Sequence, residues 1–238
     1  MPAADVVILG AARTPIGKYG GAFRDLHPAE LGAVAARAAV GRAGLEPADI
    51  DEVLIGHGRQ AGSGPNPGRQ VGRRAGIPDA APAQTINKAC ASGLQAIASG
   101  AQSILLGESN IVLAGGIESM SRMPYLIDAI DARWGRRMGN FTLVDAMYRD
   151  GFQCPLSQMI MGETAEVLAR DYAISREASD CYALESQRKA KAATDAGRFV
   201  REIAPVSVAG KSGATQIDRD EHPRGDTTIE SLRKLPPV

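Results

Sequence analysis

The chain contains 238 residues, enough for one large domain or for one domain with an appendage. Hydrophobic residues make up 44% and charged residues 23%, which excludes a chain that is disordered throughout. Because 27 basic residues balance 27 acidic ones, nothing in the charge favours nucleic-acid binding. The three cysteines are too few for a disulfide framework, and their spacing matches no zinc motif. No apolar run reaches the ~20 residues of a membrane span and no signal-like N-terminus is present, so we expect a cytoplasmic protein.

Predicted strands and helices alternate along the first half of the chain. Short apolar runs rich in β-branched residues predict strands at Val6–Gly10, Val53–Gly56, Gln84–Asn87 and Asn110–Ala114. Helical spacing between them predicts helices from Pro28 toward Gly44, at Arg69–Ala75 and at Gly93–Leu106. This alternation is typical of an α/β domain with a mostly parallel sheet covered by helices.

The helix expected at Gly93–Leu106 has no plainly solvent-facing side. Leu94 and Ile97 lie on one side, whereas the other side carries small residues such as Ala96 and Gly100. A helix of this composition is typically buried, so we expect it to lie between two layers.

The character of the sequence changes after about residue 118. Ser119–Phe152 is rich in Met, Arg and Gly and shows no clean period. Glu163–Ala173 has helical amphipathic spacing, and Ser175 suits the N-cap of a further helix running to about Thr194. From Arg198 onward the pattern predicts short strands and loops.

Cys90 lies where a predicted strand passes into a predicted helix. The unpaired N–H groups and the dipole of a first helical turn stabilise a thiolate, and they can also hold an oxyanion. Ser92 and Gly93 are small and allow a substrate to approach. Position alone leaves two interpretations open, a catalytic nucleophile or a buried structural cysteine.

A resemblance favours the first interpretation. The stretch INKACASGLQAI at Ile86–Ile97 resembles the acyl-enzyme signature of the thiolase family. Further segments agree with that family in order and spacing, among them AARTPIGKYGGAF (Ala11–Phe23), NPGRQVGRRAGIP (Asn66–Pro78), AGGIESMSRMPY (Ala114–Tyr125) and MGNFTLVDAMYRDG (Met138–Gly151). The resemblance implies a thiolase-like α/β fold in which residues 1–118 form one α/β half, with a mixed, mostly parallel sheet and helices on both faces. Residues 119–238 then form the inserted α+β loop domain that binds coenzyme A and mediates tetramerisation.

The resemblance also implies an activity. Thiolases transfer an acyl group from a 3-oxoacyl-CoA to a cysteine and then to CoA, or run the Claisen condensation in reverse. Cys90 matches the acyl-thioester nucleophile. Coenzyme A enters as the thioester substrate, with no further cofactor and no metal. Thiolases pair through this half, so the resemblance implies a homodimer or homotetramer.

Four residues match family positions that contact coenzyme A. Arg224 and Ser231 match contacts to the adenine–ribose phosphate end, Met161 a contact to pantetheine, and Phe152 an apolar contact. Each has a simpler alternative: a surface charge for Arg224, a helix cap for Ser231, and core packing for Met161 and Phe152. Ile160 stands where biosynthetic short-chain thiolases usually carry a histidine.

Several family motifs do not occur in this sequence. The Gly-His-Pro, Asn-Glu-Ala-Phe and Cys-Gly-Gly motifs of the family's C-terminal half are missing. We expect His27 at a helix start before Pro28, and His57 in a loop between two glycines. His222 is expected in a solvated loop, Cys154 in a loop before Pro155, and Cys181 packed on a helix. Thiol deprotonation and a Claisen step both need a base. We therefore expect the 238-residue chain alone to lack full thiolysis activity.

Two other functions remain open. One is a non-catalytic acyl-CoA or lipid carrier with a thiolase-like fold, and the other is a β-ketoacyl-synthase-like condensing enzyme. Because only one α/β half of the thiolase fold is present in the sequence, the helix at Gly93–Leu106 is expected to expose an apolar face.

Overall fold

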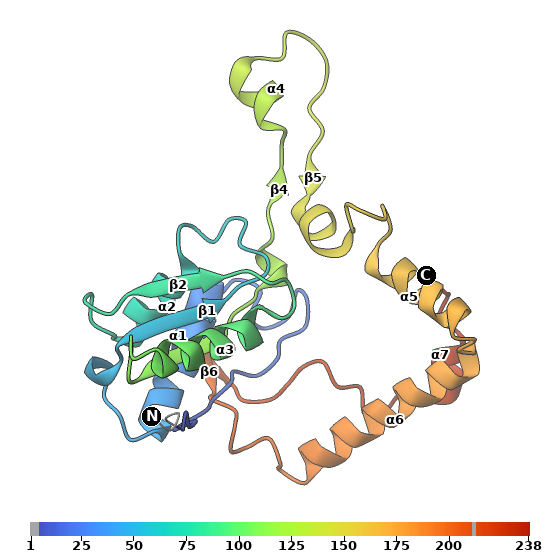
Figure 1. Cartoon of the computed structure of the whole chain (residues 1–238). Helices are drawn as coiled ribbons and strands as arrows, with labels where there is room; N and C mark the ends of the chain where they lie inside the picture. The colour runs from blue at the N-terminus through green and yellow to red at the C-terminus, as the bar shows by residue number, and fades with distance from the viewer. Residues whose placement is uncertain (1–4, 211–212) are drawn as a thin grey trace. The chain divides into compact units, whose positions relative to one another are not determined.

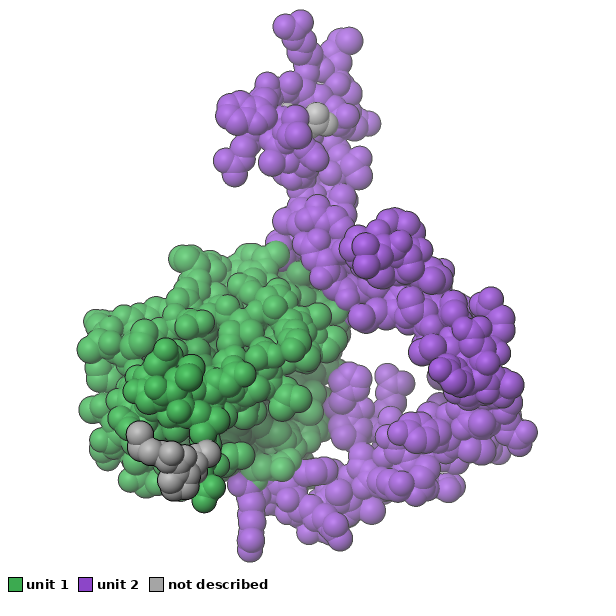
Figure 2. Space-filling model, in the orientation of Figure 1, with its two compact units in different colours: residues 1–123, 202–221 green, residues 124–201, 222–238 purple. Residues whose placement is uncertain are grey.

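A computed structural model of the protein describes residues 5–210 and 213–238. The chain divides into two compact units, coloured separately in Figure 2. Unit 1 comprises residues 1–123 and 202–221, and unit 2 comprises residues 124–201 and 222–238. The compact units divide the chain after residues 123, 201 and 221. The domain boundary expected after residue 118 remains a prediction.

A three-stranded parallel sheet forms the centre of unit 1 (Figure 1). Its strands are β1 (Glu52–Gly56), β2 (Ala83–Ile86) and β3 (Val112–Gly116), in the order β2-β1-β3. All five residues of the central strand β1 are buried, as expected for a strand with layers on both faces. The three predicted strands from Val53 onward are therefore confirmed.

Helices cover both faces of this sheet. Helices α1 (Pro28–Arg42) and α2 (Pro67–Ala75) lie on one face, where α1 and α2 share a core cluster with Val53 and Ile55. Helix α3 (Ser92–Leu105) lies on the other face, where Gly100 approaches the side chain of Val112 of β3. Figure 1 shows the sheet between α3 and the α1–α2 pair, which confirms the predicted α/β architecture.

Local sequence signals explain where α1 and α2 begin. His27 caps α1: its Nδ1 accepts the N–H of Ala29, and Glu30 accepts the N–H of His27 in return. Asn66 caps α2 by accepting the N–H of Arg69, and Gly76 ends that helix with a φ of 92°. The 3₁₀ turn η1 (Pro47–Asp49) links α1 to β1.

Helix α3 exposes the side that carries its large apolar residues. Ala96 and Gly100 on the small side are buried against the sheet, whereas Leu94 is 72% and Leu105 54% exposed. The expected exposed apolar face is confirmed. The expectation of burial between two layers is wrong among the described residues, because only the sheet side of α3 meets a layer.

The strand predicted at Val6–Gly10 is not formed. Residues 6–10 pair with no strand among the described residues, and Ile8 is 82% exposed. The segment borders an open apolar groove of about 380 Å³ that is also lined by α3 and β3. The prediction failed because β-branched, apolar composition makes a segment able to form a strand, while a strand also needs a partner for its backbone groups.

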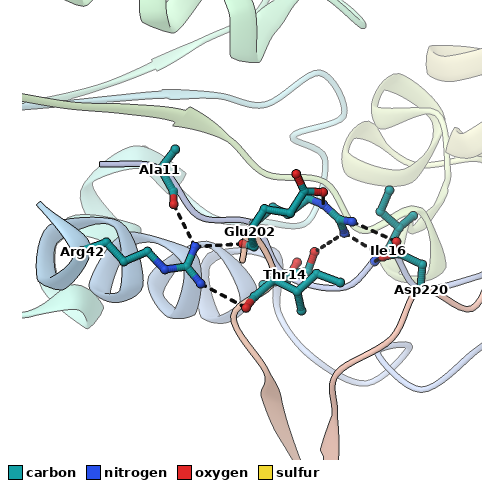
Figure 3. Close-up of polar contacts among 8 residues, drawn as sticks. Ala11, Thr14, Ile16, Arg42, Glu202 and Asp220 are labelled. Carbon is teal, nitrogen blue, oxygen red and sulfur yellow. Dashed lines mark hydrogen bonds and ion pairs between the residues drawn. The ribbon is translucent and has the colours of Figure 1, made fainter. Parts of the chain in front are cut away.

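The segment 202–221 belongs to unit 1 through backbone and side-chain bonds to residues near the N-terminus (Figure 3). Arg13 pairs with Ile203 in an isolated parallel bridge, and its guanidinium contacts Glu202 and Asp220. Arg42 of α1 donates to the carbonyl oxygens of Ala11, Glu202 and Ile203. Strands β6 (Val206–Gly210) and β7 (Gly213–Ile217) form an antiparallel hairpin within this segment.

Unit 2 consists mainly of helices and two very short strands. The elements of unit 2 are β4 (Tyr125–Leu126), α4 (Ala129–Trp134), β5 (Val144–Asp145), the π-helical turn η3 (Tyr148–Phe152), α5 (Met161–Asp171), α6 (Arg176–Asp195) and α7 (Ile229–Arg233). The amphipathic helix expected near Glu163 is α5, and Ser175 caps α6 by accepting the N–H of Ala178, as predicted. The 3₁₀ turn η2 (Met120–Arg122) precedes them in unit 1.

Candidate active site

Cys90 lies in the short turn that joins the end of β2 to the start of α3. Strand β2 ends at Ile86 and α3 begins at Ser92, and Cys90 itself is exposed. The alternative of a buried structural cysteine is therefore wrong, and the predicted handover from strand to helix is confirmed.

Side-chain hydrogen bonds fix the backbone of this turn. Ala89, immediately before Cys90, has a φ of 49°, a left-handed conformation that is unfavourable for a residue with a Cβ atom. Its N–H donates to Asn87 Oδ1 at 3.0 Å, and its carbonyl oxygen accepts the hydroxyl of Ser92 at 2.6 Å. Ser92 Oγ also accepts the N–H of Lys88 at 2.8 Å. The turn is thus held from both sides of the cysteine.

Three glycines allow α3 to start directly on the carboxyl ends of the strands. A Cβ atom at Gly56 of β1 would lie 2.2 Å from the backbone carbon of Ser92. A Cβ atom at Gly116 of β3 would lie 3.1 Å from Cα of Gly93. Because neither strand carries a side chain there, the first turn of α3 rests on backbone and holds Cys90 at the edge of the sheet.

The first turn of α3 is suited to binding negative charge. The helix has no side-chain cap among the described residues, and its first intrahelical bond runs from the N–H of Gln95 to the carbonyl of Ala91. The N–H groups of a first helical turn have no intrahelical acceptor. Together with the helix dipole, such groups stabilise a thiolate or an oxyanion.

His57 and Glu118 form a contact next to this turn that the sequence interpretation missed. His57 follows β1, is 1% exposed, and its Nε2 lies 3.0 Å from Glu118 Oε1. Glu118 follows β3, and its Oε2 accepts the N–H groups of Gly58 and Arg59, each at 3.2 Å. The signal was present in the sequence, because residues that directly follow two parallel strands meet at the same edge of the sheet.

The two other histidines have separate roles. His27 is the α1 cap described above, and its pKa is lowered, first by burial and then by the charges of Arg122 and Arg74. His222 is exposed in unit 2. The expected position of His27 at a helix start is confirmed. Within the described residues, no side chain forms a hydrogen bond with the Cys90 thiol.

The remaining cysteines belong to unit 2. Cys154 is half-buried, and its pKa is lowered by hydrogen bonds from the Ser157 side chain, then from the Ser157 and Leu156 backbones. Cys181 lies on α6 and is exposed, so its expected packing is wrong. The cause is that α6 has a single buried residue, Asp180, among its described positions.

Arg224 lies before α7, and Ser231 lies within it. The N–H of Arg224 donates to Gln187 Oε1 on α6 at 2.7 Å, and the residue is exposed. Ser231 accepts the N–H of the N-cap residue Thr228 and donates its hydroxyl to the Thr228 carbonyl. The helix-cap interpretation of Ser231 is confirmed, while contacts of both residues with coenzyme A stay predictions.

Met161 and Phe152 occupy different environments in unit 2. Met161 is the first residue of α5 and is 53% exposed, so core packing does not describe it. Phe152 is half-buried and packs edge-on against Tyr148, with 5.7 Å between the ring centroids. Phe152, Met161, Arg224 and Ser231 all belong to unit 2, whereas Cys90 belongs to unit 1.

Comparison with known proteins identifies the family. A model of the thiolase N-terminal domain matches residues 6–238, and the chain belongs to the thiolase family. A "Probable acetyl-CoA acetyltransferase" of Escherichia coli is 45% identical over 233 residues, which cover 98% of this chain and 59% of that protein. The chain thus spans somewhat more than half the length of the curated relatives it matches.

Solved structures show the same fold. The acetyl-CoA acetyltransferase of Bacillus anthracis superposes with a TM-score of 0.93 at 40% identity, covering 98% of this chain and 58% of that one. The enzyme of the same name from Syntrophomonas wolfei gives a TM-score of 0.91 at 42% identity, with the same coverage. These likenesses confirm the predicted thiolase-like fold for the part of it that the chain spans.

Two kinds of feature are absent from the described residues. No helix there is long and apolar enough to cross a lipid bilayer. In the same part of the chain, no group of three or more His, Cys, Asp or Glu side chains is arranged to hold a metal ion.

Proposed function

We propose that this chain carries the acyl-accepting half of an acyl-CoA acyltransferase and that Cys90 is its nucleophile. One observation supports this most strongly: an exposed thiol stands at the uncapped start of α3, inside a motif that matches the family. A buried or capped position would have offered neither access nor stabilisation for a developing negative charge.

The reaction follows from the chemistry of the thiolate. The Cys90 sulfur attacks the 3-oxo carbonyl carbon of a 3-oxoacyl-CoA, and the bond between C2 and C3 breaks. The bonding pair leaves on C2 as the enolate of acetyl-CoA, which takes up a proton. The thiol of a second CoA then attacks the acyl thioester on Cys90, releases acyl-CoA and returns the cysteine. The unpaired N–H groups at the first turn of α3 are suited to stabilising the oxyanion that forms on the attacked carbonyl.

Complete turnover needs a base near the Cys90 thiol, and neither His27 nor His57 is placed to act as one. His27 caps a helix and His57 faces Glu118. We therefore propose that the chain alone does not cleave 3-oxoacyl-CoA. Exchange of an acetyl group between acetyl-CoA and free CoA breaks no carbon–carbon bond. It therefore does not need the base that acts on the carbon next to the thioester.

Unit 2 supplies the groups proposed to bind coenzyme A. The guanidinium of Arg224 can stack on adenine and pair with phosphate. The exposed Met161 provides a flexible apolar surface for pantetheine, and Phe152 an aromatic one. The Ser231 hydroxyl already accepts one hydrogen bond from Thr228 and donates one to it. It can therefore contact the ligand only as an acceptor, through its remaining lone pair. The chain is further proposed to form a homodimer or homotetramer.

Isotope exchange tests this function. The chain is incubated with acetyl-CoA and labelled CoA, and label in acetyl-CoA is followed over time. We expect exchange by the natural chain, none by Cys90→Ala, and unchanged exchange by the control Cys181→Ala. Binding of acetyl-CoA without exchange would instead favour the non-catalytic carrier, and exchange that survives Cys90→Ala would refute the assigned nucleophile.

A further inference from the structure

We propose that Glu118 and Asn87 are positioning residues which set the backbone of the Cys90 turn. This inference deepens the proposed function and rests on the role of Cys90 given there. It assigns the reactivity of the thiol to a network of contacts that starts at the carboxyl end of β3 and reaches the turn after β2.

Glu118 fixes the loop that follows β1. One carboxylate oxygen accepts two successive N–H groups, those of Gly58 and Arg59, at 3.2 Å each. The other oxygen lies 3.0 Å from Nε2 of the buried His57. Three consecutive residues after β1 are therefore held by one side chain from the end of β3.

Asn87 connects that loop to the turn. Its Nδ2 donates to the carbonyl of Gly58 at 3.0 Å, and its Oδ1 accepts the N–H of Ala89 at 3.0 Å. The loop and the turn also touch directly, since a Cβ atom on Gly58 would lie 3.2 Å from the carbonyl oxygen of Ala89. Any shift of the Gly58 backbone is thus transmitted to the residue before Cys90.

Ala89 is the residue whose backbone conformation these contacts hold in place. Its left-handed φ of 49° persists only where surrounding groups over-determine it. Asn87 on its N–H and Ser92 on its carbonyl provide that constraint. Because Cys90 is the next residue, the conformation of Ala89 decides the direction in which the cysteine leaves the turn.

The buried imidazole indicates a role other than stability. Nδ1 of His57 is buried without a hydrogen-bond partner among the described residues. A buried unpaired nitrogen lowers stability, and polar groups retained at such a cost are concentrated at functional sites. The contact between buried His57 and Glu118 is therefore consistent with a role in shaping the Cys90 turn.

Site-resolved alkylation of the natural chain and its variants tests the proposal. The rate of Cys90 modification by iodoacetamide is measured on peptides by mass spectrometry and divided by the rate of exposed Cys181 in the same sample. Urea unfolding of each variant is recorded beside it. The matched control is Asn66→Ala, which removes the α2 cap and the bonds of Asn66 to Ala83 and Thr85 of β2, but no contact of residues 87–91.

We expect Asn87→Ala to lower the Cys90-to-Cys181 ratio about tenfold, since small misplacements of a reacting group have effects of this order. Asn87→Asp keeps the acceptor for Ala89 but loses the Nδ2 donor to the Gly58 carbonyl, so it should recover the ratio only in part. Glu118→Ala should lower the ratio, and the near-isosteric Glu118→Gln, which keeps acceptors for Gly58 and Arg59, should recover it. Asn66→Ala should lower the unfolding midpoint and leave the ratio unchanged.

An unchanged ratio in Asn87→Ala and Glu118→Ala overturns the proposal, as does an equal fall in Asn66→Ala. If Asn87→Ala does not fold, Glu118→Ala decides, because a ratio below that of Asn66→Ala supports positioning and an equal ratio refutes it. Alkylation involves no acyl-CoA, so these results stand even if acetyl exchange fails.

Discussion

Arg13 holds Asp220 through two parallel contacts, although 207 positions separate them in the sequence. Nη1 and Nη2 of Arg13 lie 2.7 and 2.9 Å from the two carboxylate oxygens of Asp220. The N–H of Ile16 donates to the same carboxylate at 2.7 Å. The pair anchors the segment 202–221 to residues near the start of the chain, so unit 1 combines two segments that are far apart in the sequence.

Breaking this pair should destabilise unit 1. Asp220→Asn leaves the Arg13 guanidinium without its two-point partner, and we expect a loss of about 1–3 kcal/mol in the free energy of unfolding at pH 7. Urea unfolding followed by circular dichroism measures it. Glu202→Gln is the matched control, because that carboxylate is 49% exposed and its single contact contributes little. Equal losses in the two variants would contradict the anchor.

The same pair predicts a pH dependence. Burial alone would raise the pKa of Asp220, but hydrogen bonds from Arg13 and from the N–H of Ile16 outweigh it and lower the pKa. The stabilisation is therefore present above the usual range of a carboxyl group and is lost as the pH falls through the lowered value. The stability difference between the natural chain and Asp220→Asn should shrink at pH 3. A difference that stays constant from pH 7 to pH 3 would argue against the pairing.

Replacement of Gly56 should disrupt the start of α3. A Cβ atom at Gly56 would lie 2.2 Å from backbone of Ser92, which cannot move as a flexible side chain does. We expect Gly56→Ala to cost more than about 3 kcal/mol of stability. Gly115→Ala is the matched control, since Gly115 pairs with Ile55 in the neighbouring strand and a Cβ atom there would meet nothing within 4 Å. Thermal unfolding of both variants tests the close approach.

The left-handed conformation of Ala89, the residue before Cys90, predicts different outcomes for two substitutions. Ala89→Gly relieves the strained φ and should change stability by less than about 1 kcal/mol, because glycine also gains freedom in the unfolded chain. Ala89→Val should cost about 1–2 kcal/mol, since a β-branched side chain fits this region poorly. Chemical denaturation compares them. Equal stability of the two variants would show that the turn relaxes without cost.

Cys154 should respond to its neighbour Ser157. Because Ser157 lowers the pKa of the Cys154 thiol, it increases the thiolate fraction at neutral pH. Ser157→Ala should therefore slow Cys154 alkylation at pH 7.5 by about two- to fivefold, and the difference should vanish in strong alkali, where every thiol is ionised. The rate of Cys181 serves as the reference. A rate difference that persists in alkali would indicate altered access instead.

Local patterns predicted the part of the fold that local physics controls. The strand-to-helix handover at Cys90 was found because small residues and glycines mark it in the sequence, and Ser175 was recognised as a cap by its side chain. The family motifs drew attention to Cys90. These features depend on residues within a few positions of one another.

Contacts between distant segments could not be predicted in the same way. Val6–Gly10 has the composition of a strand, but whether it pairs depends on a neighbour that no local pattern names. His57 was interpreted from its flanking glycines, whereas its contact with Glu118 comes from the adjacency of two strand ends. Cys181 was misplaced because α6, with Asp180 as its buried described residue, offers no apolar stripe to orient it.

Peptide mass spectrometry after brief exposure to an acetyl thioester of CoA is the most direct test of the nucleophile. An increase of about 42 Da, one acetyl group, confined to the peptide with Cys90 and removed by hydroxylamine, is the predicted result. An unmodified Cys90, or equal labelling of Cys154 and Cys181, would contradict the assignment.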